Sequence, residues 1–434
     1  MERVSVTGSG GQADARSLEC RISADGRYVA FSTMADLLPA DTNRQADIYV
    51  RDLVTNTLEL VSVSAAAVAG NASSKSPSVS GDGRWVAFVT TAADIAPGAT
   101  LPAVVLRDRC VSSGVPVPGC TPATEVVSLT YNGGQPSGGT TLGPPAVSAD
   151  GRFAAFGSDH TNLVADDTNT CIAFSTPGTC PDVFVRDRCL SNGVAVPGCS
   201  PTTERVSITP DGTQSDLPAS EFTAPAISDD GSIVASMVFA PIPPAGLLPE
   251  LYVRDLPHGM TELVRRMPPG GTGLASSAGR VAISGDGRFV TFENPDLIFG
   301  AGRIFPADLI FVHDRFTGAE DTVSLGSDGS RPNNASVVPS VSGDGRLFLF
   351  ASLASNLVPR DTNGVQDVFV HDRPTGTTER VSVAIDGSQP NGASFSGAIS
   401  ADGHWVCFVS SASNLLGLGV DTNGVDDVFV RKLD

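Results

Sequence analysis

The pentapeptide Ser-x-Asp-Gly-Arg recurs along this 434-residue chain and constrains its fold more than any other feature. Five copies match in full, and two further copies end in Ser232 and His404 instead of arginine. The repeated aspartates are Asp25, Asp82, Asp150, Asp230, Asp286, Asp344 and Asp402. Self-similarity at a period near 58 residues indicates one supersecondary unit that is copied along the chain. The sequence therefore predicts seven copies of that unit.

Each copy predicts a four-stranded antiparallel meander. In the sixth copy, Asp-Gly separates a short apolar segment from the alternating run at 347–350, which is typical of a β-hairpin with a type I′ turn. A polar loop at 361–364, a third strand at 367–372 and a fourth strand at 378–383 follow. No long apolar stretch has a helical period of 3.6 residues, so we expect very little helix.

A single meander leaves its faces uncovered, and radial stacking of such sheets buries them. The chain begins with residues 2–6, Glu-Arg-Val-Ser-Val, which repeat the fourth-strand text of residues 379–383. It ends on a third strand, at 427–431. We therefore predict an all-β, seven-bladed β-propeller, formed as a single domain by residues 1–434, in which residues 2–6 complete blade seven and leave no open edge.

The motif Ser-Gly-Asp-Gly-Arg-Trp-Val-Ala-Phe at Ser80–Phe88 resembles the repeat of TolB-like, WD-type bacterial β-propellers. The resemblance covers all seven copies. It implies an exported, non-catalytic interaction platform, and because the repeat residues of that family are structural, it implies no catalytic residue here. TolB-like proteins have six blades and an additional N-terminal α/β domain, so the resemblance does not extend to their role in the cell envelope.

The acidic composition limits the partners. The formal charge of −19 argues against nucleic acid and anionic membrane surfaces. No apolar run of 18 residues predicts a membrane span, and the start of the chain has no basic segment followed by an apolar one. We expect a monomer.

The eight cysteines bear on the cellular compartment. Cys110–Cys120 and Cys189–Cys199 bracket near-identical insertions, and Cys171–Cys180 brackets another. We interpret these pairs as disulfides rather than metal ligands, because Cys-x-x-Cys spacing and nearby histidines are missing. Disulfides predict a periplasmic, secreted or cell-surface location. Cys20 and Cys407 fall in core strands, and we expect buried thiols there rather than a bridge.

Four copies carry an Asp-Thr-Asn loop that ends in a further aspartate at the start of the third strand. Oxygen ligands at this spacing could hold Ca²⁺, although the loop is shorter than an EF-hand and has no bidentate glutamate. The alternative, which we favour, is a set of Asx-turns that cap strand ends. The candidate ligands are Asp41, Asn43, Asp47, Asp167, Asn169, Asp182, Asp361, Asn363, Asp367, Asp421, Asn423 and Asp427.

Charged residues interrupt the otherwise small residues of the links between blades. In a propeller these links lie at the mouth of the central channel, so they form a candidate ligand-binding patch, with solvated loop charges as the alternative. The candidates are Asp14, Arg16, Glu19, Arg21, Lys75, Glu221 and Arg280.

Two functions are consistent with these features. The first is a binding scaffold that recognises a protein, peptide or glycan at the channel mouth. The alternative is a glycan hydrolase or lyase, which would need two carboxylates facing each other about 5–10 Å apart in a deep pocket. The chain has no Gly-x-Ser-x-Gly, His-Glu-x-x-His or phosphate-loop motif, so no catalytic residue is predicted. A propeller cut from a larger peptidase is a weaker third interpretation, because the chain ends on its last predicted blade.

Overall fold

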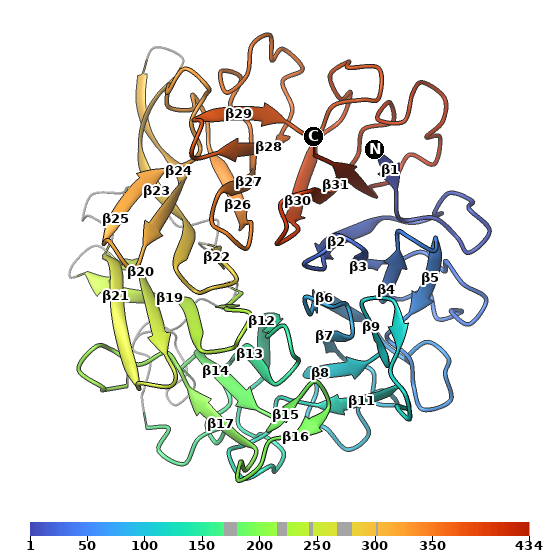
Figure 1. Ribbon diagram of the computed structural model, residues 1–434, viewed down its shortest axis with the longest axis vertical. Helices are drawn as coiled ribbons and strands as arrows, with labels where there is room; N and C mark the ends of the chain where they lie inside the picture. The colour runs from blue at the N-terminus through green and yellow to red at the C-terminus, as the bar shows by residue number, and fades with distance from the viewer. Residues whose placement is uncertain (169–179, 215–223, 243–245, 267–279, 301–302, 434) are drawn as a thin grey trace. The chain divides into compact units, whose positions relative to one another are not determined.

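The computed structural model describes residues 1–168, 180–214, 224–242, 246–266, 280–300 and 303–433. None of these residues is helical. Their strands form seven four-stranded antiparallel sheets and two short two-stranded hairpins, which is the fold of a seven-bladed β-propeller (Figure 1). The predicted fold class is therefore confirmed. By their internal contacts the blades divide into two compact units, and that all residues form a single domain stays a prediction.

Unit 1 contains residues 1–60 and the described residues from 282 onwards, which form four blades. Blade one consists of β2 (Ser17–Ile22), β3 (Tyr28–Thr33), β4 (Asp47–Asp52) and β5 (Thr57–Leu60). Blade five consists of β22 (Val281–Ile283), β23 (Phe289–Gly300), β24 (Arg303–Asp314) and β25 (Ala319–Thr322). Blade six consists of β26 (Ser336–Val341), β27 (Leu347–Ser352), β28 (Asp367–Asp372) and β29 (Thr377–Arg380). Blade seven consists of β30 (Ser394–Ile399), β31 (Trp405–Ser410), β32 (Asp427–Lys432) and β1 (Glu2–Arg3).

Unit 2 contains the other three blades, within residues 61–281. Blade two consists of β6 (Ser74–Val79), β7 (Trp85–Thr90), β8 (Ala103–Asp108) and β11 (Ala123–Val126), with the hairpin β9 (Val111–Ser112) and β10 (Val115–Pro116). Blade three consists of β12 (Thr141–Val147), β13 (Phe153–Ser158), β14 (Asp182–Asp187) and β17 (Thr202–Arg205), with the hairpin β15 (Leu190–Ser191) and β16 (Val194–Ala195). Blade four consists of β18 (Ala226–Ile227), β19 (Ile233–Ile242), β20 (Gly246–Asp255) and β21 (Met260–Arg266).

The N-terminal segment completes blade seven, as its sequence predicts. Strand β1 pairs antiparallel with β32, with Arg3 opposite Phe429, and the Val4 amide donates to the Val428 carbonyl at 2.8 Å. The first strand therefore covers the edge that β32 would otherwise expose.

The repeated aspartates are turn residues in all seven blades. In blade one, Asp25 Oδ1 accepts hydrogen bonds from the Ser23 hydroxyl and the Arg27 amide, and the Gly26 amide donates to the Ser23 carbonyl. The backbone angle φ is positive at Gly26 but not at Asp25. The predicted hairpin is correct, whereas the predicted type I′ turn is wrong. The side chain of Asp25 stabilises a type I turn that the glycine ends in the left-handed region.

The glycine of the repeat also permits contact between blades. A Cβ atom on Gly26 of blade one would lie 2.1 Å from Cδ1 of Trp405 in blade seven. In unit 2, a Cβ atom on Gly151 would lie 2.5 Å from the Trp85 ring. The aromatic residue that follows the repeat thus packs beneath the turn of the next blade, where only glycine leaves room.

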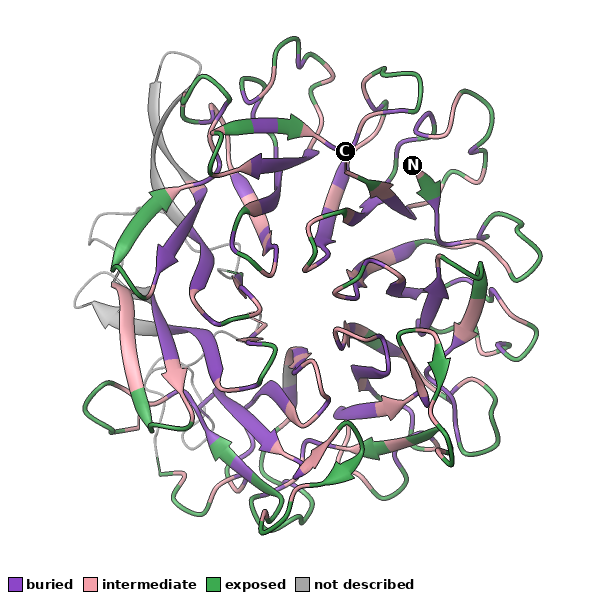
Figure 2. Cartoon of the chain, in the orientation of Figure 1, coloured by how far each residue is buried: buried purple, intermediate pink, exposed green. Residues whose placement is uncertain are grey.

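The second and third strands form the buried centre of each blade (Figure 2). In five blades, aromatic rings that face each other across these two strands stack, with centroids 5.8–6.0 Å apart, as Phe350 and Phe369 do in blade six. Alternation of large apolar residues along these strands therefore produces one aromatic layer per blade.

Disulfides join Cys110 to Cys120 and Cys189 to Cys199, as predicted. Cys180 is also disulfide-bonded, whereas its predicted partner, Cys171, lies outside the described residues. The expectation of buried thiols at Cys20 and Cys407 is wrong, because these residues form a disulfide between β2 and β31. Both lie in core strands, but the packing of blade one against blade seven brings their Cα atoms to 6.3 Å.

Candidate functional site

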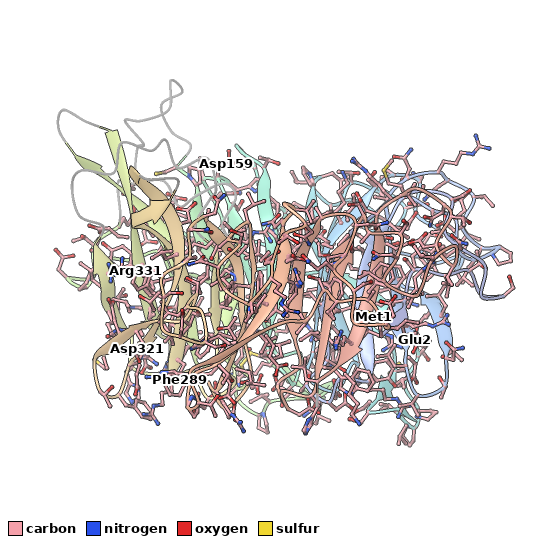
Figure 3. All side chains as sticks on the ribbon, turned by 90° about the horizontal axis from the view of Figure 1, so that it is seen from above. Met1, Glu2, Asp159, Phe289, Asp321 and Arg331 are labelled. Atoms are coloured by element: carbon pink, nitrogen blue, oxygen red, sulfur yellow. A yellow bond between two sulfur atoms is a disulfide. The ribbon has the colours of Figure 1, made fainter. Side chains whose placement is uncertain are left out.

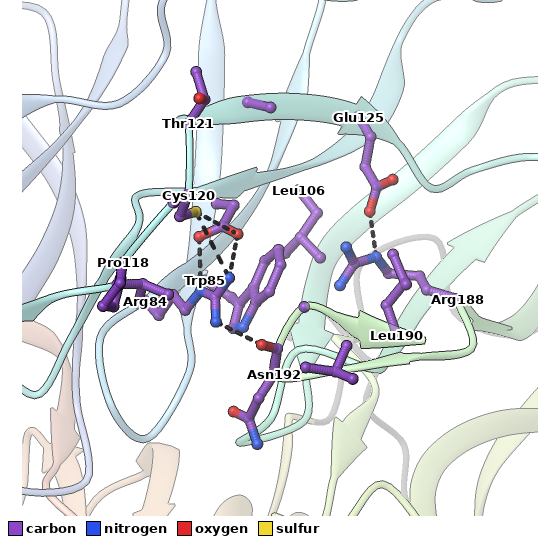
Figure 4. Close-up of a pocket in the computed structure, with 16 residues that line it drawn as sticks. Arg84, Trp85, Leu106, Pro118, Cys120, Thr121, Glu125, Arg188, Leu190 and Asn192 are labelled. Atoms are coloured by element: carbon purple, nitrogen blue, oxygen red, sulfur yellow. Dashed lines mark hydrogen bonds and ion pairs between the residues drawn. The ribbon is translucent and has the colours of Figure 1, made fainter. Parts of the chain in front are cut away.

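A pocket of about 410 Å³ lies in unit 2 between two disulfide-bonded hairpins (Figure 4). Hairpin one, β9–β10, is inserted between β8 and β11, and hairpin two, β15–β16, is inserted at the equivalent place in blade three. The C-terminal limb of hairpin one, residues 117–121, forms one side of the pocket. Residues 190 and 192–194 of hairpin two form the other side. The pocket therefore exists because two consecutive blades carry the insertion.

Each hairpin is anchored by the repeated aspartate of its own blade. In hairpin one, the Ser112 hydroxyl donates to Asp82 Oδ2 at 2.6 Å. In hairpin two, the Ser191 hydroxyl donates to Asp150 Oδ2 at 2.7 Å. The first oxygen of each aspartate already serves its turn, so the second holds the insertion against the blade.

Trp85 lies beneath the pocket and is 3% exposed. The guanidinium carbons of Arg84 and Arg188 lie 4.7 and 4.4 Å from its ring centre, which is the geometry of cation–π contacts. The two arginines come from successive blades, so this cluster also links blade two to blade three.

The carboxylates of the pocket are engaged in ion pairs. Arg84 donates from Nε and Nη2 to the two oxygens of Asp108, at 2.8 and 2.7 Å. Arg188 donates from Nε to Glu125, and its Nη1 donates to the Gly151 carbonyl. Asp108 also lies beside Cys110 and Cys120, but a disulfide between these cysteines leaves no thiolate for a metal.

Blades five and six of unit 1 contain a similar arrangement without hairpins. Arg373 lies 5.2 Å from the ring centre of Phe289 and pairs with Asp321 at 2.7 Å. Phe289 and Asp321 lie at the same side of the molecule (Figure 3). We call this contact, in which an arginine lies over the aromatic ring of the preceding blade and pairs with an acidic residue, the arginine clamp. It occurs in both units, and the hairpins turn it into a pocket in unit 2.

An arginine on the fourth strand lies between the two aspartates in three of the four Asp-Thr-Asn loops. In blade six, Arg380 Nη1 lies 3.1 Å from Asp361 and 3.0 Å from Asp367. The Asn363 side-chain amide donates to Asp367 at 2.9 Å, and the Ser382 hydroxyl donates to it at 2.7 Å. The equivalent ion pairs join Arg205 to Asp167 and Asp182, and Arg3 to Asp421 and Asp427.

In blade one a tyrosine, rather than an arginine, supplies the hydrogen bond to the loop carboxylate. Leu60 occupies the position of the arginine, and the Tyr49 hydroxyl donates to Asp41 at 2.5 Å. Asn43 again donates its side-chain amide to Asp47, at 2.7 Å. Blade four has the same exchange, since Tyr252 stands opposite Leu263 and donates to Glu250 at 2.6 Å.

These contacts bear on the calcium prediction. In blades three, six and seven a guanidinium occupies the place between carboxylates that a cation would need, and burial raises the pKa of Asp167, Asp361 and Asp427. The described asparagines, Asn43 and its equivalents, direct their amide nitrogen rather than their oxygen at the second aspartate. The residues of these three blades therefore fit an arginine better than a metal, and calcium stays a prediction for blade one. Asn169 lies outside the described residues.

The predicted ligand patch is described in part. Asp14 and Arg16 are exposed just before β2, and Glu19 and Arg21 lie half-buried along it, so these four share one segment of unit 1. Lys75 and Arg280 are exposed and belong to unit 2. Glu221 lies outside the described residues.

Sequence reasoning missed the roles of Arg3, Arg205 and Arg380 and the pocket between the hairpins. A signal for the arginines was available in the sequence. Blades with an acidic residue at the start of the third strand have either an arginine on the fourth strand or a tyrosine on the third. Blades two and five, which have Ala103 and Leu309 at that position, have neither. The pocket had no such signal, since it depends on how two hairpins pack.

No family model and no curated protein matches the sequence. Among solved structures, the chain is similar to the β-propeller domain of the Trilobed protease from Pyrococcus furiosus, with 8% identity over 97% of this chain and 95% of that one and a TM-score of 0.52. It is also similar to an oligogalacturonate lyase from Vibrio parahaemolyticus, with 12% identity over 99% and 96% of the two chains and a TM-score of 0.51. At this identity the likeness shows the propeller fold alone.

A putative TolB from Agrobacterium tumefaciens matches with 13% identity over 89% of this chain and 98% of that one, at a TM-score of 0.38. The likeness to TolB-like proteins rests on the resemblance of the repeat in the sequence. Within the described residues, no helix is long and apolar enough to cross a membrane.

Proposed function

We propose that this protein is an exported, non-catalytic scaffold that binds a polypeptide or a glycan. The observation that carries the proposal is the pocket in unit 2, which has apolar walls and whose carboxylates, Asp108 and Glu125, are both ion-paired with arginine. A general acid or base must exchange protons with a substrate, and Asp108, which Arg84 holds through two hydrogen bonds, is poorly suited to do so, as is Glu125 while it is paired with Arg188.

The other acidic pairs support binding over catalysis for a related reason. Asp182, Asp367 and Asp427 are completely buried, and Asp361 and Asp421 are less than 10% exposed. Carboxylates this deeply buried and paired with arginine are poorly placed to act on a glycan from solvent, and their contacts stabilise the loops instead. A hydrolase or lyase would need other carboxylates, such as those of the predicted channel mouth, and stays the alternative.

The disulfides support export. Three bridges lie within the described residues and Cys180 takes part in another, which is typical of oxidising compartments. They support the proposal that the protein is located outside the cytoplasm, in the periplasm, at the cell surface or in the medium.

The charged segment before β2 is a second candidate surface of the scaffold. Asp14 and Arg16 are exposed, and the Glu19 carboxylate accepts a hydrogen bond from Ser32 at 3.3 Å. Mixed charges on one exposed segment favour a polar partner, and we retain the proposal that this segment contributes to recognition at the channel mouth.

The test uses the full chain, immobilised and presented with a cell-envelope extract and a glycan array. We expect saturable binding of a defined polypeptide or glycan, competed by the soluble protein, with no chemical change to the ligand. Incubation with oligogalacturonate is the control for catalysis. New reducing or unsaturated ends appearing with turnover would contradict the scaffold and favour the lyase or hydrolase.

A further inference from the structure

The two hairpins of unit 2 are nearly identical in sequence but present different faces to the pocket. Hairpin one contributes Val117 and Pro118 from its C-terminal limb, whereas hairpin two contributes Leu190 and Val194 from its N-terminal limb and tip. These four side chains make apolar walls on both sides. Val194 is 69% exposed, so this wall is open to an incoming group.

Two hydrogen-bond donors beside the pocket have no partner within the described residues. Among the residues that the structure describes, the buried Trp85 Nε1 has no hydrogen-bond partner. Arg188 uses Nε for Glu125 and Nη1 for Gly151, and within the described chain no group accepts from its Nη2. Both oxygens of Asp108 are already occupied by Arg84. Because Trp85 Nε1 is buried, the donor left for a ligand is Arg188 Nη2, and the complement of this floor is a hydrogen-bond acceptor.

The clamp in unit 1 lacks this unpaired donor. Arg373 donates from both Nε and Nη2 to Asp321, at 3.1 and 2.7 Å. Arg188 makes only the Nε contact with the equivalent Glu125, so its Nη2 remains available where the hairpins form walls. A planar guanidinium with free N–H groups is well matched to a carboxylate.

We infer that this pocket binds the carboxyl-terminal residue of a polypeptide, an inference that rests on the proposed scaffold function. The terminal carboxylate accepts from Arg188 Nη2, and an aliphatic last side chain packs between Val117 and Leu190. A C-terminal aliphatic residue carries both groups on one Cα atom. A uronate instead surrounds its carboxylate with hydroxyls, which these apolar walls would leave without partners.

Glu125 modulates this site. Its side chain is 45% exposed, and it competes with an incoming carboxylate for Arg188. Removing its charge therefore favours the ligand, which separates this inference from one in which Glu125 itself recognises a cationic partner.

The experiment measures peptide binding to the full chain by tryptophan fluorescence. The chain has two tryptophans, so a Trp405→Phe background makes Trp85 the only reporter. The probes are acetyl-Ala-Ala-Val-Leu with a free carboxylate, the same peptide as its C-terminal amide, and trigalacturonate. We expect the free acid to bind with a Kd of about 10–100 μM and the amide at least about tenfold more weakly.

Two hairpin variants provide a matched pair. Val194→Asp adds charge to the pocket wall and is expected to weaken binding at least about tenfold. Val115→Asp makes the same change at the equivalent tip of hairpin one, which is 66% exposed and outside the pocket, and should have no effect. Glu125→Gln should tighten binding by about three- to fivefold. Because both valines are exposed, the two valine variants should keep the unfolding temperature of the parent.

Equal affinity for acid and amide, equal effects of the two valine variants, or preference for trigalacturonate would each overturn the inference. Failure here is distinguishable from failure of the scaffold. If the partner captured by the full chain binds Val194→Asp as well as the parent, the scaffold stands and the pocket is not its recognition site.

Discussion

At the scale of single residues, one side chain on the fourth strand determines how two buried carboxylates are tolerated. Arg380 is 10% exposed and contacts both Asp361 and Asp367, so its guanidinium replaces the water that these aspartates lose on burial. Blade one reaches the same result with Tyr49 on the third strand and Leu60 on the fourth. Two different pairs of residues therefore serve one structural need.

This exchange predicts a rescue. Arg380→Leu should lower the free energy of unfolding by about 3 kcal/mol, because it leaves buried aspartates without their cation. Adding Phe369→Tyr recreates the pair of blade one and should restore about 1 kcal/mol. The ring stacks of Phe31–Tyr49 and Phe350–Phe369 have nearly the same centroid distance, 5.8 and 5.9 Å, so the hydroxyl should fit.

The measurement is unfolding in urea, with Phe369→Tyr alone as the control. If the double variant is no more stable than Arg380→Leu, the tyrosine and the arginine are not equivalent solutions to the same burial problem.

At the scale of elements, blades are joined by contacts that their own strands do not reveal. The disulfide between Cys20 and Cys407 links β2 to β31 across a sequence separation of 387 residues. The hairpin disulfide Cys189–Cys199 spans only 10 residues. In the chain-entropy model, a cross-link stabilises the fold more when it closes a longer loop of the unfolded chain.

We therefore expect Cys20→Ala with Cys407→Ala to cost about 5 kcal/mol in unfolding free energy, and Cys189→Ala with Cys199→Ala about 3 kcal/mol. Urea denaturation of the two double variants under non-reducing conditions compares them directly. The order of the two losses is the informative result. A smaller loss for the long-range pair would mean that the packing of blades one and seven, rather than the cross-link, holds these strands together.

At the scale of the whole molecule, the protein carries a formal charge of −19 and buries many of its carboxylates. Arginines and a tyrosine contact the carboxylates of the described acidic loops. Because these side chains already supply partners to the carboxylates, we expect the stability of the protein not to depend on calcium.

Thermal unfolding in EGTA and in millimolar calcium tests this expectation. We expect the two unfolding temperatures to agree. A lower temperature in EGTA that added calcium restores would contradict it and would assign a cation to blade one, where Leu60 replaces the arginine. Tyr49→Phe would then remove the competing hydrogen bond to Asp41 and serve as the confirming variant.

Much of the fold could be predicted from the sequence, because each copy of the repeat forms its turn and strands through contacts between residues that are close in the chain. The Ser-x-Asp-Gly segment makes the same turn in every blade, and the alternation around it makes strands that need no distant partner to be recognised. The N-terminal strand was predictable too, because residues 2–6 repeat the text of a fourth strand. The turn type was not, since it depends on a side-chain hydrogen bond from Ser23 to Asp25.

The sequence alone determined the number of blades, the order of their strands and the blade that the first strand completes. The repeat sets the first two through hydrogen bonds between adjacent segments, and the third follows because residues 2–6 repeat the text of a fourth strand. Only the tertiary structure decided that Cys20 meets Cys407 and that two hairpins enclose a pocket above Trp85. These features depend on which side chains face each other between blades. Residues that are far apart in the chain carry no local pattern for such distances, so the physical origin of the site is packing rather than periodicity.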